Sequence, residues 1–174
     1  MANNPFLSAY EFERRFHLPR LRLTIEKAEA SYKTLEPETI DWCKCIIETA
    51  CKTVLKEHDP GWADPGKTDI GPLMRDTLKA VDVPNAQIRS GITTIAQGVA
   101  EARNKDSLAG HGKMGDKPLI GNTEIQVFVT VCDSLMQIIL AHLDKAPPDI
   151  RHTTMAFKEL EELLGLEDCN RSAQ

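Results

Sequence analysis

The feature that most constrains this chain is the spacing of its apolar residues, which recurs at alternating steps of three and four. The first such series is Leu21, Ile25, Ala28, Tyr32 and Leu35. This spacing places side chains on one face of an α-helix. Because similar series fill most of the chain, the pattern predicts an all-α fold of amphipathic helices.

Proline, glycine and aspartate separate these series. Pro37 suits the first turn of a helix, and the helix that follows has a predicted core face of Ile40, Cys43, Ile47, Cys51 and Val54. The stretch DPGWADPGKTD, residues 59–69, predicts a surface loop. A short helix over 69–81 is expected after it.

Two longer helices are predicted in the second half. The first opens at Pro84-Asn85 and carries the stripe Ile88, Ile92, Ile95, Val99 and Ala102. The second follows a glycine-rich loop over 105–121, with Asn122 as its expected N-cap. Its predicted core face is Ile125, Phe128, Cys132, Leu135 and Ile139, and a second apolar set, Val127, Val131 and Ile138, predicts cover on more than one side. Alternating apolar residues over 125–131 also suit a strand, but the apolar pattern continues unbroken to Leu143 and favours a helix.

A length of 174 residues suits one domain, and we find no internal repeat. We expect a single all-helical domain over 1–174, with N-terminal helices over 8–35. Pro147-Pro148 breaks the chain before a final helix over 153–164. The last ten residues predict a loose tail.

Composition limits the cellular setting. No apolar run approaches the roughly 20 residues of a bilayer span, and the N-terminus lacks the apolar core of a signal peptide. We therefore expect a cytoplasmic protein without a membrane partner. The net charge of −5 argues against binding nucleic acid through an overall positive surface, although a local basic pocket remains open.

Five cysteines, an odd number, do not form a disulfide framework. Cys43, Cys45 and Cys51 share one predicted helix, where they are best explained as small buried apolar side chains. A metal site there would need a distant ligand that the sequence does not specify. We therefore predict neither a metal nor a cofactor.

One short stretch combines residues that suit phosphate chemistry. Arg103 lies at the edge of a predicted buried face, Asn104 follows it, and His111 stands between two glycines in the next loop. A guanidinium binds phosphate oxygens in a fork, and an imidazole moves protons near neutral pH. The alternative is that Arg103 contacts carbonyls at a helix C-terminus and His111 is a solvated loop residue.

The run ITTIAQGVAEARNKDSLAGHG, residues 92–112, resembles the signature of the abortive-infection C-terminal family. IIETACKTVLKEH, residues 46–58, is similar to that family's upstream helix, and the resemblance extends over about 45–143. The family is grouped with the HEPN superfamily of helical domains, many of which are metal-independent ribonucleases of toxin–antitoxin and anti-phage systems. Their motif is Arg, a polar residue and His, matched here by Arg103, Asn104 and His111. Seven residues separate Arg103 from His111, one more than the usual maximum.

The resemblance implies an HEPN-like bundle that acts as an RNA-cleaving effector, with a homodimer and an antitoxin or defence-system protein as partners. In that mechanism His111 takes a proton from a ribose 2′-OH, Arg103 stabilises charge on the phosphate oxygens, and Asn104 orients a ligand or the loop. The alternatives are a non-catalytic HEPN-like module that binds RNA, nucleotide or a protein, and a helical structural protein without a ligand.

Five further residues are candidate substrate-binding or orienting groups. Lys105, Lys113 and Lys117 share the loop with His111 and suit phosphate contacts, or ordinary loop solubility. Glu48 is a candidate orienting partner for Arg103, or a plain surface carboxylate. Arg89 lies 14 residues before Arg103, about 21 Å along a helix, and suits a peripheral RNA or dimer contact.

Overall fold

A computed structural model describes residues 4–64, 66, 69–106 and 121–143, and for residues 102–106 it describes the backbone alone. Contacts divide the chain into residues 1–144 and residues 145–174, and all described residues belong to the first unit. The predicted helix over 153–164, the expected tail and Cys169 lie outside the described residues.

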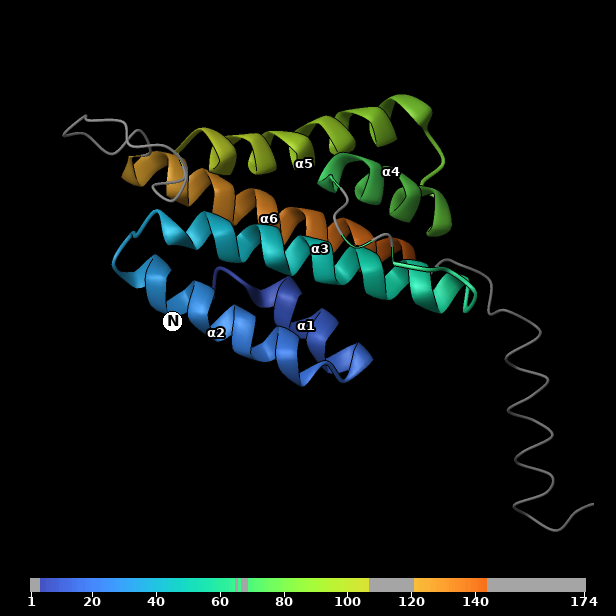
Figure 1. The fold of residues 1–174 in the computed structure, drawn as a ribbon, viewed down its shortest axis with the longest axis horizontal. Helices are drawn as coiled ribbons and strands as arrows, with labels where there is room; N and C mark the ends of the chain where they lie inside the picture. The colour runs from blue at the N-terminus through green and yellow to red at the C-terminus, as the bar shows by residue number, and fades with distance from the viewer. Residues whose placement is uncertain (1–3, 65, 67–68, 107–120, 144–174) are drawn as a thin grey trace, which may run out of the picture. The chain divides into compact units, whose positions relative to one another are not determined.

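The described part of the chain contains six α-helices and no strand (Figure 1). They are α1 (Leu7–Phe16), α2 (Pro19–Lys33), α3 (Glu38–His58), α4 (Ile70–Ala80), α5 (Ala86–Asp106) and α6 (Asn122–Leu143). The expected all-α fold is therefore confirmed. So is the preference for helix over strand at 125–131, because the long apolar pattern outweighs local β-propensity.

Helix α3 is central in the bundle. It packs against α2 on one side and against α4 and α6 on others, as Figure 1 shows. All five residues of its predicted core face are buried. The helix ends at His58, directly before Asp59-Pro60-Gly61, as predicted.

Helices α1 and α2 are joined by a tight turn in which His17 has a left-handed backbone conformation. The phenol of Tyr10 in α1 donates to Glu29 in α2. Helix α1 is also tied to α6, because the Ser8 backbone N–H and hydroxyl both donate to the Asp133 carboxylate, at 2.8 and 3.1 Å. Because Asp133 supplies both acceptors, the N-terminal helix is oriented by polar contacts as well as by apolar burial.

The predicted core stripe of α5 is only partly correct. Ile92 and Val99 are buried, but Ile88 and Ile95 are 54% and 50% exposed. For Ala102 the structure describes only the backbone. Ala96 and Ala100 take the buried positions instead. The reason is that α5 packs mainly on α4 and contacts α3 and α6 much less, so one edge of its apolar stripe has no described neighbour.

Helix α6 also differs from expectation. Its buried residues are Ile125, Val129, Cys132, Leu135, Met136, Ile139 and Leu140. Phe128 is only partly buried. In the second predicted set, Val131 and Ile138 pack against the core, whereas Val127 is 53% exposed. Cover on more than one side is therefore confirmed, but without Val127. Contacts with both α1 and α3 explain why the buried face is broad.

By length and composition alone, α6 meets the criteria for a helix that crosses a membrane, which corrects the expectation that no segment would. The buried core helix of a soluble bundle meets the same criteria. In this chain α6 buries seven residues against its neighbours. Its length and composition are therefore weak evidence for a membrane partner.

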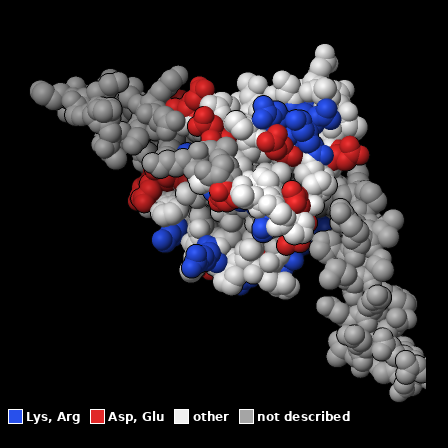
Figure 2. Space-filling model, turned by 45° about the vertical axis from the view of Figure 1, so that its right-hand side comes forward, with Lys and Arg blue, Asp and Glu red and all other residues white. Residues whose placement is uncertain are grey.

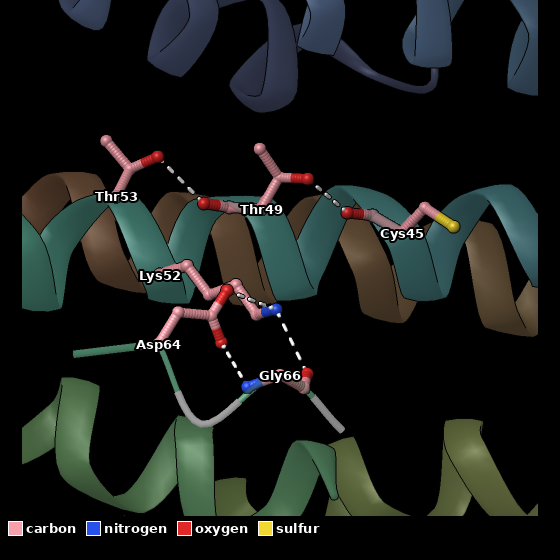
Figure 3. Close-up of polar contacts among 6 residues, drawn as sticks. All are labelled: Cys45, Thr49, Lys52, Thr53, Asp64 and Gly66. Atoms are coloured by element: carbon pink, nitrogen blue, oxygen red, sulfur yellow. Dashed lines mark hydrogen bonds and ion pairs between the residues drawn. The ribbon is translucent and has the colours of Figure 1, made fainter. Parts of the chain in front are cut away.

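The loop after α3 is held by two lysines of that helix. Lys52 Nζ lies 2.8 Å from Asp64 Oδ2 and donates to the Gly66 carbonyl, while Asp64 accepts the Gly66 backbone N–H (Figure 3). The Lys52 ammonium, with the Gly66 N–H, lowers the pKa of the Asp64 carboxyl. Lys56 donates to the carbonyls of Pro60 and Trp62. These contacts fix the described part of the predicted loop over 59–69 against α3.

Candidate functional site

The candidate motif begins in the last turn of α5. Arg103, Asn104 and Lys105 have helical backbone, and α5 extends to Asp106. The predicted loop therefore does not begin at residue 105, and Lys105 lies in the helix. Their side chains lie outside the description, and His111, Lys113 and Lys117 fall among the undescribed residues 107–120. The geometry between Arg103 and His111 therefore remains a prediction.

Both flanks of this motif are anchored by a small apolar cluster of Ile40, Val99 and Ile125, each 1% exposed. Val99 lies one turn before Arg103 in α5, and Ile125 lies in the first turn of α6. Partly buried side chains pack around these three: Tyr32, Leu35, Phe128 and Val131. The cluster therefore holds the end of α5 against the starts of α3 and α6.

The start of α6 has a capping arrangement that differs from the prediction. The Gly121 backbone N–H donates to Glu124 Oε2 at 3.1 Å, and the Ile125 N–H donates to the Gly121 carbonyl. Gly121 therefore occupies the N-cap position, and Asn122 is the first helical residue. A glutamate three positions after the cap satisfies the free N–H group, so the spacing of Gly121 and Glu124 is a signal that the sequence interpretation missed.

Glu48 is paired with Lys44 one turn earlier in α3, with Lys44 Nζ 3.4 Å from Glu48 Oε1. It lies eight residues after Ile40, about 12 Å along the helix axis. The end of α5 packs near Ile40. Orientation of Arg103 by Glu48 stays a prediction, since the Arg103 side chain is not described.

Arg89 lies near the start of α5, half-buried, and its guanidinium donates to the Val83 carbonyl before the helix. This contact closes the turn between α4 and α5. The described role of Arg89 is therefore structural, and its predicted peripheral RNA or dimer contact stays untested.

The interpretation of the three α3 cysteines as buried side chains holds for Cys43 and Cys51 and fails for Cys45. Cys43, Cys51 and Cys132 are buried, whereas Cys45 is exposed. Burial raises the pKa of the Cys51 thiol to about 12. A hydrogen bond with Cys43, together with burial, raises the pKa of Cys132 well above its usual value. These two thiols stay protonated near neutral pH and are poor nucleophiles.

Among the described residues, no group of three or more His, Cys, Asp or Glu side chains is arranged to hold a metal ion. Lys and Arg side chains are interspersed with Asp and Glu side chains on the face drawn in Figure 2. Any anion-binding site on that face is therefore local rather than spread over the whole surface.

The backbone of Arg103 and Asn104 thus lies at the end of a bundle helix, beside the start of the last described helix. The family model of Abi_C, an HEPN-like domain, matches residues 21–143. The chain belongs to this HEPN-like family. No curated protein and no solved structure matches it.

The HEPN-like match begins at residue 21. The resemblance noted in the sequence begins only at about residue 45. Helix α2 therefore lies almost entirely within the HEPN-like match, which extends further toward the N-terminus than the resemblance over about 45–143. Helix α1 lies before the matched residues. The match contains Arg103, Asn104 and His111.

Proposed function

We propose that this HEPN-like protein is a metal-independent endoribonuclease that acts in the cytoplasm as a defence or toxin effector. The observation that carries the proposal is the Arg103-Asn104…His111 motif inside a matched HEPN-like domain. Support comes from the position of Arg103 and Asn104 in the last turn of α5, where the cluster of Ile40, Val99 and Ile125 anchors both flanks.

In the proposed reaction His111 takes the proton of a ribose 2′-OH, and the 2′ oxygen attacks the adjacent phosphorus. The bond from phosphorus to the 2′ oxygen forms as the bond to the 5′ oxygen breaks, and the released 5′ oxygen takes up a proton. Arg103 stabilises the charge that develops on the non-bridging oxygens. The products are a 2′,3′-cyclic phosphate and a 5′-hydroxyl.

The proposed active form is a homodimer, and the exposed edge of α5 supports it. Ile88 and Ile95 are half-exposed there, and a Cβ added at Gly91 or Gly98 would meet no atom within 4 Å. The exposed residues from Ala86 to Gly98 are all uncharged: Ala86, Gln87, Ile88, Ser90, Gly91, Thr94, Ile95 and Gly98. An uncharged face can meet a second copy of itself without like-charge repulsion. It also leads along α5 to the motif.

The test is a cleavage assay with purified protein, total RNA and a transfer RNA pool in EDTA. We expect cleavage that leaves 2′,3′-cyclic phosphate ends and is lost in Arg103→Ala and His111→Ala. Arg75→Ala and His142→Ala are matched controls, because these residues lie in α4 and at the far end of α6. Full activity in either motif variant would contradict the site assignment.

A non-catalytic HEPN-like module is the second candidate, favoured by the seven-residue separation of Arg103 and His111 and by the acidic balance. It predicts that the purified protein binds RNA, nucleotide or an antitoxin-like partner protein through the loop and leaves RNA intact. The same assay, run beside a binding measurement, distinguishes the two candidates.

A further inference from the structure

A surface away from the candidate motif combines an aromatic ring with cations where α2 and α3 pack together. The Lys27 Nζ lies 4.9 Å from the centroid of the Trp42 ring. Trp42 is half-buried, and Lys27 is exposed. The Lys27 ammonium therefore lies over the face of the Trp42 indole at the solvent-facing seam of the two helices.

Arg20 extends this seam toward the start of α2. It is one turn before Thr24 and two turns before Lys27, a spacing that places all three on one edge of the helix. The opposite edge faces α1, because Glu29 accepts from Tyr10 there. Arg20 is exposed, and among the described residues it has no ion pair.

Threonines form the α3 side of the seam. The Ser31 and Thr39 hydroxyls are 3.1 Å apart, and with Lys27 over Trp42 they fix the antiparallel register of α2 and α3. The same register places Arg20, near the start of α2, opposite Thr49, and Thr53 lies one turn further along α3. Figure 3 shows these two threonines on the side of α3 that faces the N-terminal helices, away from Lys52.

The hydroxyl protons in the seam are already used within the helices. Thr24 donates to the Arg20 carbonyl, Thr49 to the Cys45 carbonyl and Thr53 to the Thr49 carbonyl. Only acceptor lone pairs remain on these oxygens. Acceptors suit the 2′-OH and amino groups of RNA, whereas the carboxylates of an acidic peptide need donors.

From these contacts we propose that the α2–α3 seam binds single-stranded RNA. A base that stacks on Trp42 displaces the exposed Lys27 side chain from the ring, and the released ammonium and Arg20 contact backbone phosphates. The seam would hold substrate outside the cleavage motif, so the inference rests on RNA being the ligand of the proposed function. It requires neither Arg103 nor His111.

The test uses the fluorescence of Trp42, with His111→Ala present so that RNA stays intact. Trp62→Phe leaves Trp42 as the only tryptophan, and Trp42→Phe leaves Trp62. Each protein is titrated with a single-stranded RNA oligonucleotide, and binding is followed in parallel by anisotropy of a label on the RNA. We expect saturable quenching in the Trp62→Phe protein and none in the Trp42→Phe protein.

Charge variants test the phosphate contacts. Arg20→Gln and Lys27→Gln should each lower the dependence of log affinity on log salt by about 0.7. Arg75→Gln removes the same charge from α4 and should leave that dependence unchanged. Trp42→Ala should weaken binding about fivefold to 150-fold, the range that corresponds to about 1–3 kcal/mol of stacking. Circular dichroism checks that this variant folds, and Trp42→Phe provides the conservative comparison.

Three results would overturn the inference: no RNA binding, RNA binding without quenching of Trp42, or equal quenching by double-stranded RNA. Binding of a polyglutamate peptide in place of RNA would assign the seam to an acidic protein partner instead. Quenching in a Trp62→Phe chain that keeps His111 and cleaves no RNA would support the seam and contradict the nuclease. Cleavage by the same chain without quenching would support the nuclease and contradict the seam.

Discussion

Val99 in α5 and Ile125 in α6 lie in one buried cluster, although the whole candidate motif falls between them in the sequence. Ile40 from the start of α3 completes the cluster. The positions at which the motif segment leaves α5 and reaches α6 are therefore set by apolar packing. Three of the predictions below concern the stability of this end, the start of α6 and the face of α5.

Ile125→Ala should lower the free energy of unfolding by about 2–5 kcal/mol, because it removes a large side chain from a closely packed site. Val127→Ala, two residues along the same helix and 53% exposed, should change it by less than about 0.5 kcal/mol. Urea denaturation followed by circular dichroism measures both values. Equal stability of the two variants would contradict the anchoring role of the cluster.

Glu124→Ala should destabilise the protein by about 1 kcal/mol, since it leaves the Gly121 N–H without its carboxylate partner at the start of α6. Glu124→Gln is the matched control, because an amide oxygen can accept the same hydrogen bond. Thermal unfolding of the three proteins compares them. A glutamine variant as unstable as the alanine variant would show that charge, rather than the cap, is responsible.

Ile95→Glu should convert the proposed homodimer into a monomer, because two-fold pairing through α5 would bury the added carboxylates together. Leu7→Glu adds the same charge at a residue of α1 that is 57% exposed, and it should leave the dimer intact. Sedimentation velocity distinguishes the two states. A dimer that survives Ile95→Glu would place the interface elsewhere.

Tyr10 makes the free energy of unfolding depend on pH in the alkaline range. Burial, followed by the hydrogen bond to Glu29 and that residue's charge, raises the pKa of Tyr10 to about 12. The folded pKa exceeds the unfolded value of about 10, so this stabilisation is complete below pH 10. It is lost as the pH rises through about 12.

Denaturation at several pH values therefore tests the contact between Tyr10 and Glu29. The difference in unfolding free energy between the wild-type protein and Tyr10→Phe should shrink from about pH 10 upward. A difference that stays constant over that interval would contradict the raised pKa.

The helices could be predicted without the structure, because the apolar spacing and the Pro, Gly and Asp breaks are local signals. Helices α3 and α4 end close to the predicted positions. The five residues predicted for the core face of α3 are all buried. The same signals also predict the position of Arg103 and Asn104, which fall in the last turn of a predicted helix. The family match over 21–143 agrees with the resemblance that these residues carry.

Which residues of each apolar stripe are buried depends on the helices that pack against it, and therefore on the tertiary structure. Ile88 and Ile95 repeat with the correct helical spacing yet are exposed, because α5 packs mainly on α4. The seam of Trp42 and Lys27 likewise depends on the antiparallel register of two helices. Periodicity shows which residues share a face, but the neighbour that covers this face is set by contacts between distant segments.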